Sequence, residues 1–383
     1  MWEATEKYME LKRSFIRDDL TLNKNGLLKE IKKLFDDFDN IEKDLEKQKY
    51  AEELLKLKVK LDINLVRDTK CKYSITSSTL LNSIGNDFRE IVFQNWGTYG
   101  KFRKDFLEQI AKVGQYFIKE NGVIPHILTD IDDTLYANPT EHHGLAGSDE
   151  SYTPLKPYPG IKKFYEIIKS KHNDTKYGEF YVTILSATPS IKKCKKFSDE
   201  KLNEIIGNNF SFLEGEASKT KMLLSGITGT VGATVENQEL TVKPLNAIAG
   251  NTKFNKYKQY SLLFPEYSFI FIGDNGQGDI IAGERMVNDN PNCQVFLHNI
   301  IEKGKRKFNN TDIEERTTER MHFFADYKEL VTQMTMFHFS EPEIKEIEND
   351  YLLDSLVGGK KKRTASKKNR KIIKKRSNTK RRQ

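Results

Sequence analysis

The sequence predicts an α/β fold, in which a parallel sheet covered by helices on both faces follows a helical N-terminal region. Two observations lead to this prediction. Up to residue 121 apolar side chains recur at helical spacing, whereas after Gly122 short apolar runs alternate with helical stretches. Short buried strands that are joined by helices are typical of parallel sheets.

The N-terminal region, residues 1–121, is expected to contain two helices. The first spans Gly26 to about Leu61, where aliphatic and aromatic residues recur every three or four positions among Lys and Glu. The second has one apolar face, and Asn121-Gly122 is its expected C-terminal cap. That face consists of Phe102, Phe106, Ile110, Val113 and Phe117.

The α/β domain, residues 122–340, holds four apolar runs that are expected to be strands. They are VIPHILT (123–129), EFYVTILS (179–186), YSFIFIG (267–273) and CQVFLHN (293–299). A helix is expected from Gly160, and a Lys-rich helix after the second run. The Gly-, Thr- and Val-rich stretch at about 222–250 is expected to be a small β-hairpin or loop insertion, and 341–358 a linker or helix.

The net charge of +8 is unevenly distributed, because residues 360–383 hold 14 Lys and Arg and no acidic residue. The remaining 49 basic and 55 acidic residues give the body of the chain a net charge of about −6. The tail from 359 to 383 is expected to be disordered, because its only aliphatic side chains are Ala365, Ile372 and Ile373. It is expected to bind nucleic acid, a nuclear import receptor or an anionic membrane surface.

Composition also bears on the compartment. No window has the 18 or more apolar residues of a membrane span, and the start lacks the pattern of a signal peptide. Three cysteines, without metal-ligand spacing, predict neither disulfides nor zinc. We expect a cytoplasmic protein, peripheral at a membrane or nuclear if the tail directs it there. The content of Lys, Asn and Ile suggests an AT-rich genome, such as that of a large DNA virus.

Polar side chains follow three of the runs, at the sheet edge where ligands of parallel sheets bind. Asp130, Asp132 and Asp133 follow the first run, Ser186 ends the second, and Asp274 and Asp279 follow the third. Two carboxylates about 4 Å apart repel by roughly 4 kcal/mol at an effective dielectric near 20. A hard cation would offset this repulsion, and Mg²⁺ prefers carboxylate, water and phosphate oxygens. A Mg²⁺ site is therefore predicted from Asp130, Asp132, Asp274 and Asp279, whereas Asp133 is expected only to shape the turn.

The same residue types suit phosphate chemistry. A carboxylate can act as nucleophile, a second carboxylate two positions on can transfer protons, and a hydroxyl and an ammonium group can hold phosphoryl oxygens. Ser186 offers the hydroxyl. The ammonium group would come from the cluster Lys253, Lys256 and Lys258, which precedes the third acidic segment.

In order, DIDDT, Ser186, the lysine cluster and GDNGQGD resemble the four motifs of the haloacid dehalogenase superfamily of phosphotransferases. More narrowly, TDIDDTL, YPGIKKFY, LSATP, LFPEYSFIFIGDNGQGD and FFADYKELV are similar to the catalytic domain of the actin-patch-type phosphatidate phosphatases, relatives of the lipins. This resemblance covers roughly residues 124–334. It implies a Rossmann-like parallel sheet of the superfamily's type, with a small insertion.

The resemblance also implies individual roles. Asp130 would attack phosphorus and form an aspartyl phosphate, while Asp132 would protonate the leaving oxygen and later activate water. Ser186 would hold a phosphoryl oxygen, Lys253 (with Lys256 as the alternative) would offset the charge, and Asp274 with Asp279 would complete the Mg²⁺ site. Three features depart from the family pattern and concern the substrate: Asn275, Ser186-Ala187-Thr188-Pro189 and His298.

The sequence therefore predicts a Mg²⁺-dependent phosphatase whose substrate is phosphatidate or a related lipid phosphate. Two alternatives remain open. One is a phosphatase of the same superfamily that acts on a soluble phosphoester, such as a nucleic-acid end or a phosphoprotein. The other is a catalytically idle scaffold that binds nucleic acid through its tail.

Overall fold

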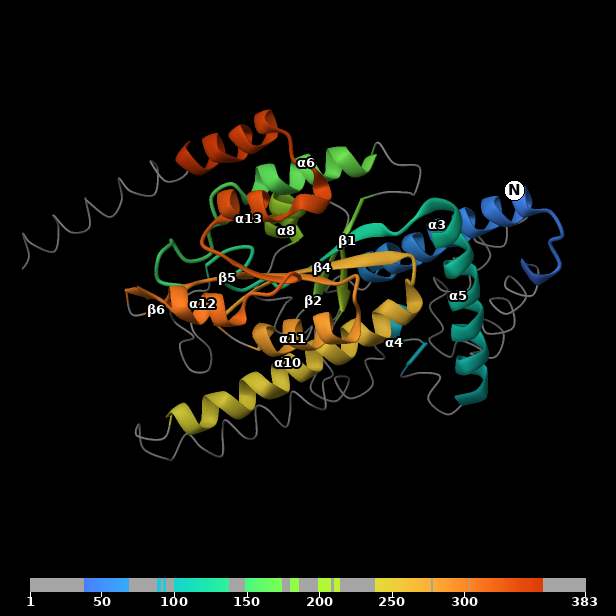
Figure 1. Cartoon of the computed structure of the whole chain (residues 1–383), viewed down its shortest axis with the longest axis horizontal. Helices are drawn as coiled ribbons and strands as arrows, with labels where there is room; N and C mark the ends of the chain where they lie inside the picture. The colour runs from blue at the N-terminus through green and yellow to red at the C-terminus, as the bar shows by residue number, and fades with distance from the viewer. Residues whose placement is uncertain are drawn as a thin grey trace, which may run out of the picture. The chain divides into compact units, whose positions relative to one another are not determined.

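The computed structural model describes most of the chain between residues 38 and 353, and Figure 1 shows its elements. The described residues are 38–68, 88–90, 92–93, 100–137, 149–173, 180–185, 199–207, 210–213, 238–276, 278–302 and 304–353. Two compact units are present. One is helical and the other contains most of a β-sheet with its helices.

Six parallel strands form the main sheet, in the order β3-β2-β1-β4-β5-β8. The strands are β1 (Ile124–Thr129), β2 (Val182–Leu185), β3 (Phe210–Leu213), β4 (Tyr267–Asp274), β5 (Gln294–His298) and β8 (Met321–Phe324). Every residue of β4 is buried, as expected of a strand covered on both faces. The predicted parallel α/β sheet is confirmed, including all four apolar runs.

Helices cover both faces of this sheet. On one side lie α6 (Ile161–Asn173), α8 (Asp199–Ile206) and α13 (Tyr327–Gln333), and on the other α11 (Asp279–Asp289) and the first part of α10 (Gln238–Leu263) (Figure 1). The unit also contains α12 (Asn310–Arg316), the 3-10 helix η5 (Thr335–Phe337), a helix over 341–353 and a two-stranded hairpin, β6 (Ile301–Glu302) with β7 (Lys305–Arg306). The helix predicted from Gly160 is confirmed as α6.

The helical unit consists of the described part of 38–125 together with residues 256–268. Its helices are α3 (Asp44–Asp68), α4 (Phe88–Glu90), α5 (Gly100–Asn121) and the end of α10. A buried ion pair lies in its core, since Lys58 Nζ is 2.7 Å from Glu266 Oε1 and donates to Leu263 O at 3.0 Å. The end of α10 thus belongs to this unit, which the sequence prediction did not anticipate.

Of the two helices expected in the N-terminal region, the structure confirms one and contradicts the other. The second is confirmed as α5, and Gly122 caps it at a φ of 78°, with its N–H donating to Ile118 O at 2.8 Å. The first is wrong as a continuous helix, because the chain leaves the helical conformation at residues 40–43 and α3 begins at Asp44. Its apolar spacing could not reveal this short break.

The expected insertion at 222–250 is wrong for its second part. Residues 238–250 form the first half of α10, and the rest of the stretch lies outside the described residues. Thr and Val favour strands only weakly, and packing against neighbouring elements overrides such a preference. Residues 341–353 are helical, in agreement with a linker or helix at 341–358, whereas the basic tail lies outside the described residues.

Two further expectations concern cysteines and membranes. Cys293 is buried, while Cys71 and Cys194 lie outside the described residues. Among the helices that the structure describes, none is both long and apolar enough to cross a membrane.

Candidate metal centre

The strand order places a topological switch point between β1 and β4. From β1 the sheet continues through β2 to β3 in one direction, and from β4 through β5 to β8 in the other. Ligands of open parallel sheets bind beyond the carboxyl ends of the strands at such a point. Asp130 directly follows β1, its N–H donates to Ile272 O at 2.9 Å, and Asp274 is the last residue of β4.

Three carboxylates meet at this point. Asp130, Asp274 and Asp279 each offer an oxygen atom, and these atoms lie within 4.8 Å of one another. All three side chains are buried, and Asp274 and Asp279 have no exposed surface. The predicted grouping of these residues at one sheet edge is confirmed.

Asp132 differs from these three. Its side chain is half-buried and its carboxylate is not part of the three-residue group. Its roles as a metal ligand and in proton transfer therefore stay predictions. Ser186, the expected hydroxyl group, lies outside the described residues.

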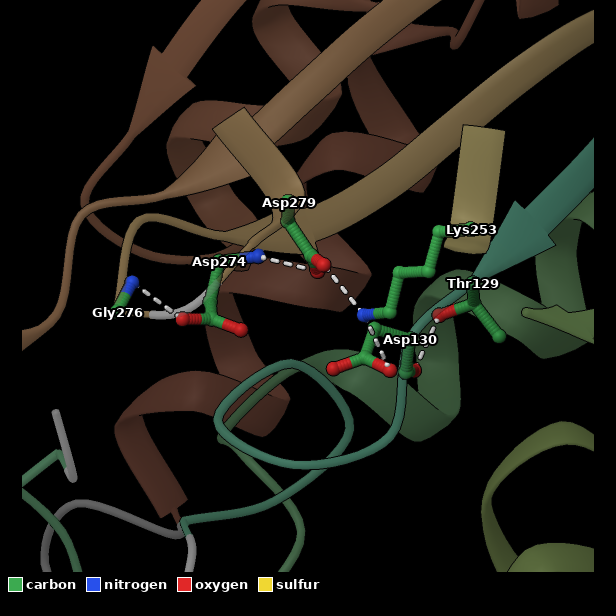
Figure 2. A network of polar contacts seen from close by, with 6 residues as sticks. All are labelled: Thr129, Asp130, Lys253, Asp274, Gly276 and Asp279. Atoms are coloured by element: carbon green, nitrogen blue, oxygen red, sulfur yellow. Dashed lines mark hydrogen bonds and ion pairs between the residues drawn. The ribbon is translucent and has the colours of Figure 1, made fainter. Parts of the chain in front are cut away.

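Lys253 supplies the positive charge in the cluster (Figure 2). Its Nζ atom lies 2.9 Å from Asp130 Oδ1 and also forms an ion pair and hydrogen bond with Asp279 Oδ1. Lys253 comes from α10, whereas Lys256, its alternative, belongs to the helical unit. The preference for Lys253 is thus supported by its contacts.

The cluster carries more negative than positive charge, since three carboxylates face one ammonium group. Burial raises the pKa of Asp274 well above its usual range, and repulsion by neighbouring carboxylates adds to this. Burial likewise raises the pKa of Asp279 to about 7, against the attraction of Lys253. Burial would lower the pKa of Lys253, but Asp130 and Asp279 outweigh it and raise this pKa above its usual value. A divalent cation would remove the imbalance.

Asp274 is oriented as a ligand for such a cation. Its Oδ1 accepts a hydrogen bond from the N–H of Gly276, and its own N–H donates to Asp279 Oδ2 at 3.4 Å (Figure 2). Its Oδ2 is buried, and within the described part of the chain no hydrogen-bond donor reaches it. A buried carboxylate oxygen without a donor is costly, so this oxygen fits a metal ion, and an all-oxygen ligand set suits Mg²⁺.

Close backbone packing positions Lys253 and Asp279. A Cβ atom at Gly250 would lie 2.5 Å from Gly278 O, and one at Gly278 would lie 2.4 Å from Gly250 N. Glycine at both positions therefore lets α10 approach the first turn of α11 closely. Lys253 is one helical turn beyond Gly250, on the same face of α10, and Asp279 directly follows Gly278. The sequence prediction missed this role of Gly250, because it placed the residue in a hairpin or loop and not in a helix.

Asp133 shapes the turn after the nucleophile candidate, as predicted. It adopts a φ of 57°, its N–H donates to Tyr136 O at 2.9 Å, and its Oδ1 accepts from the N–H of Asp149 at 3.2 Å. Its carbonyl oxygen lies 2.8 Å from Nδ1 of His298. His298, one of the departures from the family pattern, thus contacts the backbone of this turn.

Asn275, another of these departures, is buried. Its Nδ2 donates to Asn299 Oδ1 at 2.7 Å, and its Oδ1 accepts from the N–H of Ile300 at 3.1 Å. Both groups join the loop after β4 to the segment after β5. No motif or spacing in the sequence indicated the part played by Asn299.

The chain was also compared with known proteins. No protein-family model, curated protein or solved structure matches it.

Proposed function

We propose that this protein is a Mg²⁺-dependent phosphatase that hydrolyses phosphomonoesters through an aspartyl-phosphate intermediate. One observation carries the proposal: Asp130, Asp274 and Asp279 meet around Lys253 at the switch point of a parallel sheet. The motif resemblance in the sequence supports it independently. Together they favour phosphoryl transfer over other chemistry.

In this proposal Asp130 is the nucleophile. Its carboxylate lies beside Lys253, whose charge would offset the negative charge shared by nucleophile and phosphoryl group. Mg²⁺ bound by Asp130, Asp274 and Asp279 would polarise a phosphoryl oxygen and neutralise developing charge. Asp132 would protonate the leaving oxygen and then accept a proton from the attacking water. Ser186 would hold a phosphoryl oxygen.

The substrate has two candidates. Phosphatidate or a related lipid phosphate is the first, on the strength of the motif resemblance. A soluble phosphoester is the second. An idle scaffold is disfavoured, since buried excess carboxylate charge destabilises a protein that binds no cation.

The test is a phosphate-release assay on three substrates with and without Mg²⁺. They are phosphatidate in mixed micelles, an aryl phosphate and a 5′-phosphorylated oligonucleotide. Asp130→Asn is expected to lower the rate at least about 10³-fold, whereas Asp289→Asn, an exposed carboxylate at the other end of α11, is the matched control and is expected to have little effect.

The outcomes separate the alternatives. Release from the aryl phosphate but not from phosphatidate would reject the lipid substrate. Absence of metal-dependent release from all three substrates would reject the phosphatase and favour the scaffold.

A further inference from the structure

Asn275 directly follows Asp274 and is hydrogen-bonded to three consecutive residues at the carboxyl end of β5. Its backbone N–H donates to His298 O at 3.0 Å. Its side-chain Nδ2 donates to Asn299 Oδ1 at 2.7 Å, and its Oδ1 accepts from the N–H of Ile300 at 3.1 Å. Both polar atoms of the side chain are therefore engaged. Because Asn275 is only 1% exposed, it presents almost no surface to a substrate.

The segment to which Asn275 is bonded is itself fixed by other parts of the α/β unit. The backbone N–H of Asn299 donates to Phe324 O, in β8, at 2.8 Å. The side chain of Asn299 forms two further bonds with the backbone of Phe308, since its Nδ2 donates to the carbonyl oxygen at 2.9 Å and its Oδ1 accepts from the N–H at 3.1 Å. Residues 298–300 are therefore a rigid anchor for the side chain of Asn275.

Gly276, on the other side of Asn275, joins this anchor to the carboxylate of Asp274. Its N–H donates to Asp274 Oδ1 (Figure 2), and its carbonyl oxygen accepts from Lys307 Nζ at 2.9 Å. The backbone on both sides of the peptide group that follows Asn275 is thus held in place. Asp274 Oδ1 therefore has a fixed donor, while Asp274 Oδ2 is the oxygen that we assign to the metal ion.

Asp279, another carboxylate of the cluster, is positioned by different contacts. Its neighbour Gly278 packs against α10, where a Cβ atom at Gly250 would lie 2.5 Å from Gly278 O. A change of the side chain at Asn275 acts first on Asp274, which is adjacent in the chain, and leaves the packing beside Asp279 in place. We therefore expect such a change to weaken the binding of a cation by misplacing one ligand, and not to abolish it.

We propose that Asn275 is a positioning residue for Mg²⁺ binding, which fixes the backbone between Asp274 and Gly276 and so holds the Asp274 carboxylate in the orientation that the cation requires. Residues that orient metal ligands commonly change metal affinity by about 10–100-fold when they are replaced. The inference rests on the proposed function, because it requires the Mg²⁺ site of the phosphatase. It gives Asn275 a role in cation binding, whereas the departure from the family pattern implied a role in the choice of substrate.

The test is calorimetric titration of the full chain with Mg²⁺, in the unmodified protein and in Asn275→Ala. This substitution removes both side-chain hydrogen bonds and keeps the backbone N–H that donates to His298 O. The Kd for Mg²⁺ is expected to rise about tenfold or more. If the alanine variant does not fold, Asn275→Ser, whose shorter side chain cannot form both bonds, is expected to raise the Kd in the same direction.

Thr183→Val is the matched control, because Thr183 is fully buried in β2 and its hydroxyl group also takes part in two hydrogen bonds. These bonds join it to His126 Nε2 and Ser211 Oγ, each at 2.8 Å. Both variants are expected to lower the midpoint of urea unfolding in the presence of a chelator, but only Asn275→Ala should raise the Kd for Mg²⁺. An unchanged Kd in Asn275→Ala, or equal increases in both variants, would overturn the proposal.

Assays of phosphate release keep this inference distinct from the proposed function. Mg²⁺ binding that depends on Asn275, without release of phosphate from any of the three substrates, would reject the phosphatase and leave the positioning role. If Asn275→Ala keeps its affinity for Mg²⁺ but raises KM for one substrate more than for another, Asn275 acts on the substrate and the proposal is wrong. Absence of Mg²⁺ binding in the unmodified protein would reject the metal site and this inference together.

Discussion

Two buried lysines, Lys58 in the helical unit and Lys253 in the α/β unit, differ in the number of carboxylates around them. Lys58 faces a single carboxylate, Glu266, whose two oxygens lie 2.7 and 2.8 Å from its Nζ. Lys253 faces Asp130 and Asp279, with Asp274 nearby. The first group of charges is balanced, and the second has a negative excess.

The pKa values of the two lysines shift in opposite directions because of this difference in charge. Burial lowers the pKa of Lys58, and Glu266 offsets only part of that effect. At Lys253 the attraction of two carboxylates outweighs burial, and the pKa is raised. A balanced buried pair stabilises one packing arrangement, whereas a cluster with excess negative charge is suited to bind a cation. Burial of a charge alone therefore does not identify a functional site.

The largest expected effect on stability comes from breaking the balanced pair. Lys58→Met should lower the free energy of unfolding by about 3–5 kcal/mol, because it leaves the Glu266 carboxylate buried without its partner. Urea unfolding measures this change. The double variant Lys58→Met/Glu266→Leu should recover most of the loss, and a double variant as unstable as the single one would contradict the assignment of a balanced pair.

Removing a carboxylate from the unbalanced cluster should have the opposite sign. With a chelator at pH 8, Asp274→Asn should raise the free energy of unfolding by about 1–3 kcal/mol, since it relieves repulsion among buried charges. The asparagine can still accept the hydrogen bond from Gly276. A variant less stable than the unmodified protein under these conditions would show that the cluster has no excess of negative charge.

The pH dependence of this effect can be stated with its sign. The pKa values of Asp274 and Asp279 are raised in the folded state, that of Asp279 to about 7, so the folded protein binds more protons than the unfolded chain between about pH 4 and 7. Without metal, stability should therefore fall as the pH rises through this window. Asp274→Asn should show a smaller fall in urea unfolding at pH 5 and pH 7.

A smaller effect is expected from the glycine that positions Lys253. Gly250→Ala should lower kcat about tenfold, because its Cβ would push α10 away from Gly278 and shift the ammonium group. Gly283→Ala is the matched control, since its Cβ would meet Val295 Cγ1 at 2.7 Å, at the packing of α11 on β5.

A double-variant cycle separates positioning from general strain. In a Lys253→Met background, Gly250→Ala should change the rate little, although its effect on stability should persist. Equal rate losses in both backgrounds would show that Gly250 acts on something other than Lys253.

Much of the α/β unit could be predicted from the sequence, because buried strands of a parallel sheet are continuous apolar runs and their ends carry the polar side chains. β4 and the acids Asp274 and Asp279 illustrate this. The grouping of Asp130 with them follows from the rule that parallel strands end at the same sheet edge.

Other features could not be predicted, for physical reasons. The hairpin strands have two residues each, too few for an alternation pattern. The role of Gly250 depends on the approach of two backbones from distant segments. Residues 256–268 belong to the helical unit because of contacts such as the pairing of Lys58 with Glu266. These two residues are far apart in the sequence, so no local pattern predicts their contact.

The central claim is that the cluster of excess carboxylates binds a divalent cation, and calorimetric titration of the full chain with Mg²⁺ tests it most directly. The unmodified protein and Lys58→Met should each bind Mg²⁺ at this site with similar affinity, whereas Asp274→Asn should lose that binding. Absence of Mg²⁺ binding in the unmodified protein, or unchanged binding in Asp274→Asn, would contradict the claim.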